Sequence, residues 1–292
     1  MAEQLTFSTG IATPGQSQAA REALQAQRHR LSGVLHGLSR DAWDSQSRCA
    51  EWSVHEVVRH LCDTTLKATL LLRGASAAEV GASDMDPRTT PIDWMGHSAD
   101  EMPEATLDVF DTATDGLLAA VDERGGTGPA DVEWVYGTVP WSIGVLHVFW
   151  DAWLHERDIL IPLGQPQQST AAESTAAAVY GLVMASLPIL AIGGGYDATV
   201  QLSGDGGGAY RLQAEIGPDG GRTFSLAGLP AKGTITVTVD KSAADDDSGQ
   251  LSGTLEGAVD FLCGRDVEPL TGPPEPLGQL SMLRAFMLTP AS

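Results

Sequence analysis

The pattern of apolar residues along this chain of 292 residues changes in character near residue 170. Before that point apolar residues recur at helical intervals, and Leu24, Leu31 and Leu35 lie on one stripe of a helix predicted over residues 17–38. After it, short runs rich in β-branched residues alternate with Gly, Asp and Pro turns. A chain that contains both patterns in succession favours an α+β fold built in two parts.

Four helices are predicted in the first part, residues 1–165. They cover residues 17–38, a segment that starts at Ser53, residues 104–123, and a segment that starts in the run PWSIG. The second start is the clearest, because Ser53 as N-cap and Glu56 three residues later form a capping box. Four helices with one long connection predict a four-helix bundle. The stretch GTGPADVEWVYG has no clear period and is expected to be irregular.

The long connection runs from Gly74 to Pro103 and is rich in Ala, Ser, Asp and Pro. Loops of this length commonly form lids or the walls of pockets. Trp94 and His97 within it therefore either face a substrate or belong to a surface turn, and the sequence leaves both interpretations open.

The second part, residues 171–292, begins with the helical run AAAVYGLVMASLPIL. Four strand-like runs follow and predict a smaller α+β domain with an antiparallel sheet: ATVQLSG, YRLQAEIG, TFSLAG and TITVTVD. Helical spacing then returns in SGTLEGAVDFLCGR.

The formal net charge of −21 would repel phosphate backbones and anionic membranes, so we expect neither nucleic acid nor a membrane as a partner. No apolar run is expected to approach the ~20 residues that span a bilayer, and MAEQLTFSTG lacks the features of a signal peptide. Three scattered cysteines do not make a disulfide framework. These features predict a cytoplasmic monomer or homodimer. Few lysines beside many arginines are typical of a GC-rich genome, for example an actinobacterial one.

Two histidines and one carboxylate are candidates for a metal site. Asp151 and His155 lie four residues apart, on one face of the fourth helix, and His60 lies at the edge of the apolar stripe of the second helix. Such a set gives a divalent ion three ligands and leaves positions open for water or substrate, as in catalytic sites. Zinc is the first choice, with iron(II), manganese and nickel also compatible. The alternative is a hydrogen-bonded core histidine beside an ordinary helix-surface pair.

His147 lies one turn before Asp151 on the same stripe. The spacing allows three interpretations: a substitute ligand, a general base, or a histidine that only lines a pocket.

Two stretches, LSRDAWDSQSRCAEWSVHEVVRHLCD and LHERDILIPLG, resemble the paired signatures of the mycothiol-dependent maleylpyruvate isomerases and their DinB-like relatives. The family pattern has a Trp and a helix start before a His-Leu pair, then an acidic residue four before a histidine, an Asp, and a Leu-Gly helix end. The matching positions here are Trp52, Ser53, His60, Leu61, Asp151, His155, Asp158, Leu163 and Gly164.

The resemblance implies a DinB-like bundle whose metal is held by His60, Asp151 and His155, followed by a smaller α+β domain. By the same match, Arg265 after Gly264 is implied to bind carboxylates of substrate or thiol, whereas a role in compensating the helix dipole is the structural alternative. One departure is Asp151 itself, because the isomerases usually carry Glu at that position.

The function implied by this resemblance is that of a metal-dependent enzyme. The metal would activate a low-molecular-weight thiol, mycothiol, and the thiolate would isomerise a small electrophilic substrate or be transferred to it. Two alternatives remain. One is a tailoring enzyme of secondary metabolism that kept the fold without thiol dependence, and the other is a non-catalytic binding protein stabilised by its metal.

Overall fold

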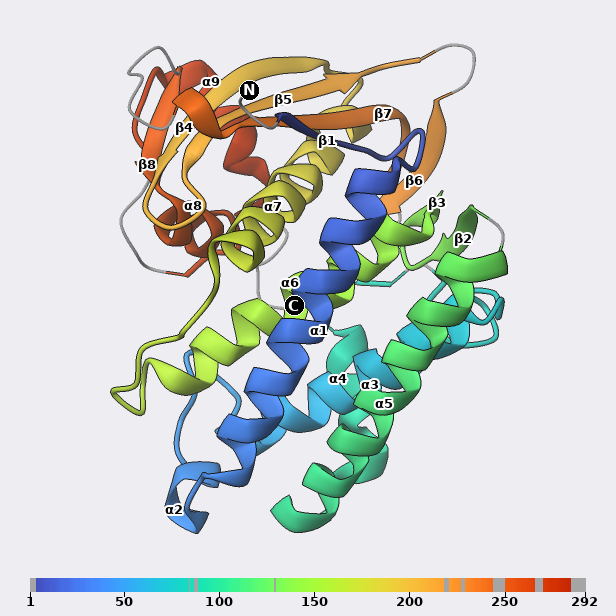
Figure 1. Cartoon of the computed structure of the whole chain (residues 1–292), viewed down its shortest axis with the longest axis vertical. Helices are drawn as coiled ribbons and strands as arrows, with labels where there is room; N and C mark the ends of the chain where they lie inside the picture. The colour runs from blue at the N-terminus through green and yellow to red at the C-terminus, as the bar shows by residue number, and fades with distance from the viewer. Residues whose placement is uncertain are drawn as a thin grey trace.

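Four long helices form a bundle beside a twisted sheet (Figure 1). The structure, a computed structural model, describes residues 4–83, 85–86, 89–128, 130–217, 221–226, 229–243, 250–265 and 270–284. The bundle helices are α1 (Pro14–His36), α3 (Val54–Leu72), α5 (Pro103–Thr127) and α6 (Trp141–Leu160). Shorter helical segments lie in the connections: α2 (Arg40–Trp43), α4 (Thr90–Met95) and a 3-10 turn, η1 (Gly96–Ser98).

The N-terminus of α3 has the capping interactions that the sequence predicts. The Ser53 hydroxyl accepts a hydrogen bond from the Glu56 N–H, and the Glu56 carboxylate accepts one from the Ser53 N–H at 2.7 Å. Trp52, just before the cap, packs in the same apolar cluster as Val57. The predicted capping box is confirmed, and it fixes where His60 lies along the helix.

Within the described residues the sheet has eight strands in the order β2-β3-β6-β7-β5-β4-β8, with β1 paired to β7. All pairs are antiparallel except β4 with β8. The strands are β1 (Gln4–Ser8), β2 (Asp131–Trp134), β3 (Gly137–Pro140), β4 (Tyr196–Ser203), β5 (Gly208–Glu215), β6 (Arg222–Leu226), β7 (Leu229–Asp240) and β8 (Leu251–Thr254). The four predicted runs are β4 to β7, so the predicted antiparallel sheet is confirmed.

Strands β1, β2 and β3 come from the first part of the chain and join the sheet of the second. The expectation that GTGPADVEWVYG is irregular is wrong, because it forms β2 and begins β3. Only Val132 and Trp134 of β2 are buried. Two buried residues are too few to reveal the alternation that is typical of a strand. Gly137 pairs with Phe224 at a φ of 133°, where a Cβ would lie 2.4 Å from the Thr223 carbonyl oxygen.

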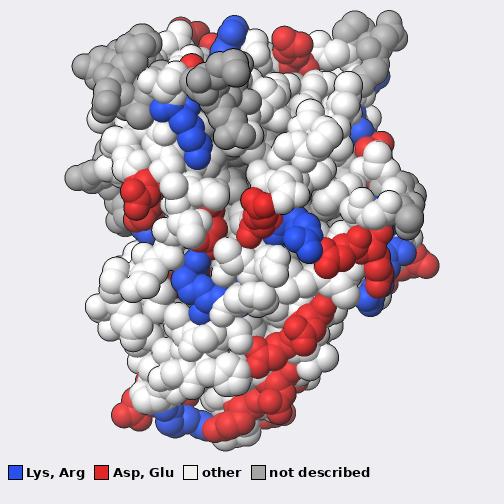
Figure 2. Space-filling view, viewed as in Figure 1, with Lys and Arg blue, Asp and Glu red and all other residues white. Residues whose placement is uncertain are grey.

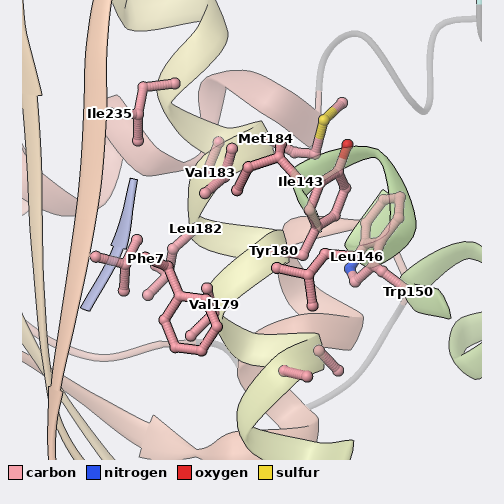
Figure 3. Close-up of a cluster of buried hydrophobic side chains, with 14 of the residues drawn as sticks. Phe7, Ile143, Leu146, Trp150, Val179, Tyr180, Leu182, Val183, Met184 and Ile235 are labelled. Carbon is pink, nitrogen blue, oxygen red and sulfur yellow. The ribbon is translucent and has the colours of Figure 1, made fainter. Parts of the chain in front are cut away.

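Helix α7 (Ala171–Ala191) lies between the sheet and the bundle. Its Val179, Leu182 and Val183 pack among apolar side chains from both parts, including Phe7 of β1 and Ile143 of α6 (Figure 3). Among the described residues, α7 is long and apolar enough to cross a membrane, so the expectation that no segment approaches this length is wrong. Because 94% of that apolar window is buried inside the protein, the helix has the burial of a core helix.

The remaining helical segments are α8 (Leu255–Leu262), α9 (Pro274–Leu280) and a 3-10 turn, η2 (Lys241–Ala243). The predicted fold class, a helical bundle followed by an α+β part, is confirmed. The division into residues 1–165 and 171–292 stays a prediction. Acidic side chains form a band over the part of the surface where Figure 1 places α5 (Figure 2).

Candidate metal centre

The three predicted ligands lie together between α3 and α6. Nε2 of His60 is 3.5 Å from Oδ2 of Asp151, and Nε2 of His155 is 3.6 Å from Oδ1 of the same carboxylate. The two imidazole rings are 4.9 Å apart between centroids, and one ligand atom from each residue lies within 4.8 Å of the others. The structure thus brings together residues that are about ninety positions apart in the sequence, and metal binding by them stays a prediction.

The donor set fits a divalent ion. Atoms bound at about 2.1 Å to one tetrahedral ion lie about 3.4 Å apart, which is close to both nitrogen–oxygen distances here. The same distances are too long for good hydrogen bonds. Because Nδ1 of His155 faces the Asp158 carboxylate at 3.0 Å, a neutral His155 carries its proton on Nδ1 and turns the Nε2 lone pair toward Asp151. In that state, Nε2 and the Asp151 carboxylate oxygen are two lone-pair donors with room for a cation between them.

The electrostatics of the site also favour a cation. Burial opposes ionisation of Asp151, but His60 and His155 outweigh burial and hold the pKa of Asp151 well below its usual range. Burial likewise favours the neutral imidazole of His155, yet Cys49 and Asp158 outweigh it and raise the pKa of His155 to about 10. Without a metal, His155 therefore retains a proton that an incoming ion would displace.

Two further side chains, Thr64 and Trp52, lie next to the predicted ligands, and the sequence did not indicate this position for either. Thr64, four residues after His60, donates a hydrogen bond from Oγ1 to Oδ2 of Asp151 at 3.3 Å. The Trp52 ring lies 5.2 Å from the His60 ring and 6.2 Å from the His155 ring. The i+4 spacing from His60 was the available signal for Thr64.

Behind His155, the buried carboxylate of Asp158 is held by Arg265. Nε of Arg265 donates to Oδ1 at 3.0 Å and Nη2 donates to Oδ2 at 2.6 Å. The Cys49 thiol lies at the same place, 3.2 Å from Oδ2 of Asp158 and 3.7 Å from Nδ1 of His155. Arg265 therefore contacts protein groups next to the ligands, and its predicted role in binding substrate or thiol stays untested.

His147 lies outside the group of mutually close ligand atoms. Its Nδ1 is 2.7 Å from the hydroxyl of Tyr180, which is itself 2.7 Å from the hydroxyl of Tyr136. Burial lowers the pKa of His147 to about 4, with Asp151 acting in the opposite direction. The imidazole is therefore neutral at pH 7, a state in which it can accept a proton.

The predicted lid segment lies over α3. The indole of Trp94 packs against Lys67 with the ammonium 4.3 Å from the ring centroid, and Nε2 of His97 is 3.5 Å from Oδ1 of Asp63. Asp63 follows His60 by three residues, so His97 contacts α3 one helical turn from a predicted ligand. An open, mostly apolar groove between α3 and α5, around Leu66 and Leu70, shares no residue with them.

Fold and site together define a class: a helical-bundle protein with a candidate two-histidine, one-carboxylate metal centre and an attached sheet. Residues 24–160 match the sequence profile of the mycothiol maleylpyruvate isomerase N-terminal domain. The helical part of the chain thus matches the N-terminal domain of that family, and the predicted resemblance is confirmed.

Two solved structures share the fold over most of the chain. One is a mycothiol-dependent maleylpyruvate isomerase with a histidine-to-alanine mutation, at 14% identity and a TM-score of 0.55. The other is a mycothiol-dependent maleylpyruvate isomerase at 15% identity and a TM-score of 0.54. Each alignment covers 87% of this chain and 92% of the other chain. A search of curated proteins gave no match.

Proposed function

We propose that this protein is an enzyme that uses a divalent metal to activate a low-molecular-weight thiol, mycothiol, against a small electrophilic substrate. The reaction is either isomerisation through reversible addition of the thiolate or transfer of the sulfur to the substrate. The family of the helical part and the fold shared with the isomerases support the thiol. The observation that carries the proposal is the convergence of His60, Asp151 and His155 on one position.

The three side chains would hold the ion, with zinc as the first choice. A bound divalent ion supplies Lewis acidity, which stabilises the thiolate of a bound thiol relative to the thiol. Three protein ligands leave at least one coordination position for an exogenous group. A set of four protein ligands would have favoured a purely structural ion instead.

The other residues have roles that follow from their contacts. Thr64 orients the Asp151 carboxylate through its hydrogen bond. Trp52 covers the two imidazoles and excludes water from that side. His147, which is held by Tyr180, is the candidate general base, and because burial lowers its pKa to about 4 it would hold a proton released near the site only transiently. Arg265, which the resemblance implies to bind carboxylates of substrate or thiol, is already paired with Asp158.

The finer assignments belong to the same proposal. A cytoplasmic enzyme, monomeric or homodimeric, would meet both the thiol and a small-molecule substrate there. The net charge of −21 supports the absence of nucleic acid and of an anionic membrane surface from its partners.

Thiol dependence tests the proposal. Zinc-loaded protein is titrated with mycothiol in a calorimeter, and the same titration is made with His60→Ala and with His29→Ala, whose histidine is exposed on α1. We expect binding by the parent and His29→Ala and its loss in His60→Ala, with a largely retained fold. Absence of mycothiol binding by the zinc-loaded parent would rule out the thiol. A large fall in the melting temperature of His60→Ala, together with loss of mycothiol binding, would indicate a metal that only stabilises the bundle.

A further inference from the structure

The metal ligand His155 is connected to a residue from the other end of the chain. Arg265 follows α8 and lies 107 residues from Asp158, whose carboxylate it holds through Nε and Nη2. Oδ2 of Asp158 in turn lies 3.0 Å from Nδ1 of His155. The three side chains form one line of contacts, from Arg265 through Asp158 to the imidazole.

We propose that Arg265 is a positioning residue for the metal, which acts on His155 through Asp158. The inference rests on the proposed metal site and adds that the site is incomplete without the second part of the chain. Asp158 fixes the Nδ1–H tautomer and the orientation of the His155 ring, so that Nε2 points toward Asp151. Arg265 in turn fixes Asp158, because two parallel hydrogen bonds hold the plane of the carboxylate.

The contacts of Arg265 favour this role over direct binding of a substrate. Besides its two bonds to Asp158, Nη1 donates to the Cys263 carbonyl oxygen at 3.1 Å and Nη2 contacts the Cys49 sulfur at 3.5 Å. A guanidinium has five N–H groups, and these contacts use four of them. Its positive charge is already matched by a carboxylate with a fully buried side chain. A second carboxylate would have to displace Asp158.

A neighbouring pair provides a matched control. Arg157, which precedes Asp158 on α6, donates from Nε and Nη2 to the buried Asp260 of α8 at 3.2 and 2.8 Å. Its side-chain hydrogen bonds to described residues reach Asp260, Glu256 and Gln167, and none of them reaches Asp158. Loss of Arg157 therefore removes a bidentate ion pair of the same kind from the same contact between α6 and α8 and leaves each direct contact of Asp158 in place. Arg48, which lies 3.7 Å from Asp158 and 3.2 Å from Asp260, is the one side chain described here that pairs with both carboxylates.

The test measures metal affinity rather than turnover. The dissociation constant for zinc is determined by competition with a chelator, and the visible absorption of the cobalt(II)-substituted protein reports ligand geometry. Both measurements are made on the parent, Arg265→Met, Asp158→Asn and Arg157→Met. We expect Arg265→Met and Asp158→Asn to weaken zinc binding about 10- to 100-fold and to change the cobalt spectrum. Arg157→Met lowers the melting temperature and leaves both metal readouts near the parent. Arg265→Lys, which keeps the charge, recovers part of the affinity.

Two results would overturn the inference while leaving the metal site intact: zinc affinity of Arg265→Met equal to that of the parent, or an equal loss in Arg157→Met. If Arg265→Met fails to fold, Arg265→Lys and Asp158→Asn decide by the same readouts. A parent protein that binds no zinc would overturn the proposed function together with this inference.

Discussion

Two arginines on α1 offer a test of how charge is accommodated inside the bundle. Arg28 is fully buried, and none of its guanidinium nitrogens has a hydrogen-bond partner among the described residues. Arg30, two residues later, donates from Nε and Nη2 to Glu156, each at 2.8 Å, and from Nη1 to Glu173. We predict that Arg28→Met raises the free energy of unfolding and that Arg30→Met lowers it.

The magnitude for Arg28 follows from its surroundings. Burial lowers the pKa of Arg28 to about 10, with Asp151 and Cys62 opposing the shift. At about 1.4 kcal/mol for each pKa unit, the lowering corresponds to about 3 kcal/mol of destabilisation. The Phe110 ring, 5.6 Å from the guanidinium carbon, returns up to about 2 kcal/mol as a cation–π contact. Arg28→Met should therefore raise the free energy of unfolding by about 1 to 3 kcal/mol.

Arg30→Met should lower the free energy of unfolding by about 3 to 5 kcal/mol, because two fully buried carboxylates lose the cation that neutralises them. The assay is equilibrium unfolding in urea with the slope compared between variants, so that only changes in midpoint count. Destabilisation by Arg28→Met of more than about 1 kcal/mol would contradict this prediction, since it would mean that the guanidinium has a partner that stabilises it.

Three further outcomes are expected. Ser53→Ala should lower the free energy of unfolding by about 1 kcal/mol because α3 loses its capping box, and an unchanged urea midpoint would contradict this. Gly137→Ala should unfold at a lower temperature, since the added Cβ meets the Thr223 carbonyl at 2.4 Å, whereas an unchanged melting temperature would mean that β3 shifts freely. Zinc affinity should rise about tenfold for each pH unit between about pH 6 and about pH 8. The reason is that His155 keeps its proton up to a pKa of about 10, and the ion must displace that proton. A zinc affinity that does not change with pH in competition titrations would contradict this.

The helices and the candidate metal ligands could be predicted from the sequence because local rules determine them. The Ser53 capping box fixes the phase of α3, and the four-residue spacing of Asp151 and His155 places both on one face of α6. The resemblance to the isomerases then joined two stretches that no local rule connects. The structure brings these residues together, within the distances given above.

The features that the sequence did not reveal depend on contacts between distant segments. Strands β1 and β2 are too short to show a period, and each is defined by its partner, β7 or β3. The line from Arg265 through Asp158 to His155 depends on how α8 packs against α6, which no spacing encodes. The orphaned guanidinium of Arg28 also looks ordinary in the sequence, because a helix with polar residues gives no sign of which ones are enclosed.

Metal binding by His60, Asp151 and His155 is the claim on which the other proposals rest, and a zinc titration of chelator-treated protein tests it most directly. We predict binding of one zinc ion per chain with a dissociation constant below about a micromolar, in the range of protein sites with three ligands. We also predict at least a hundredfold loss of zinc affinity in each of the three alanine variants, about 3 kcal/mol or more. Binding weaker than millimolar in the parent, or alanine variants that bind zinc as the parent does, would contradict it.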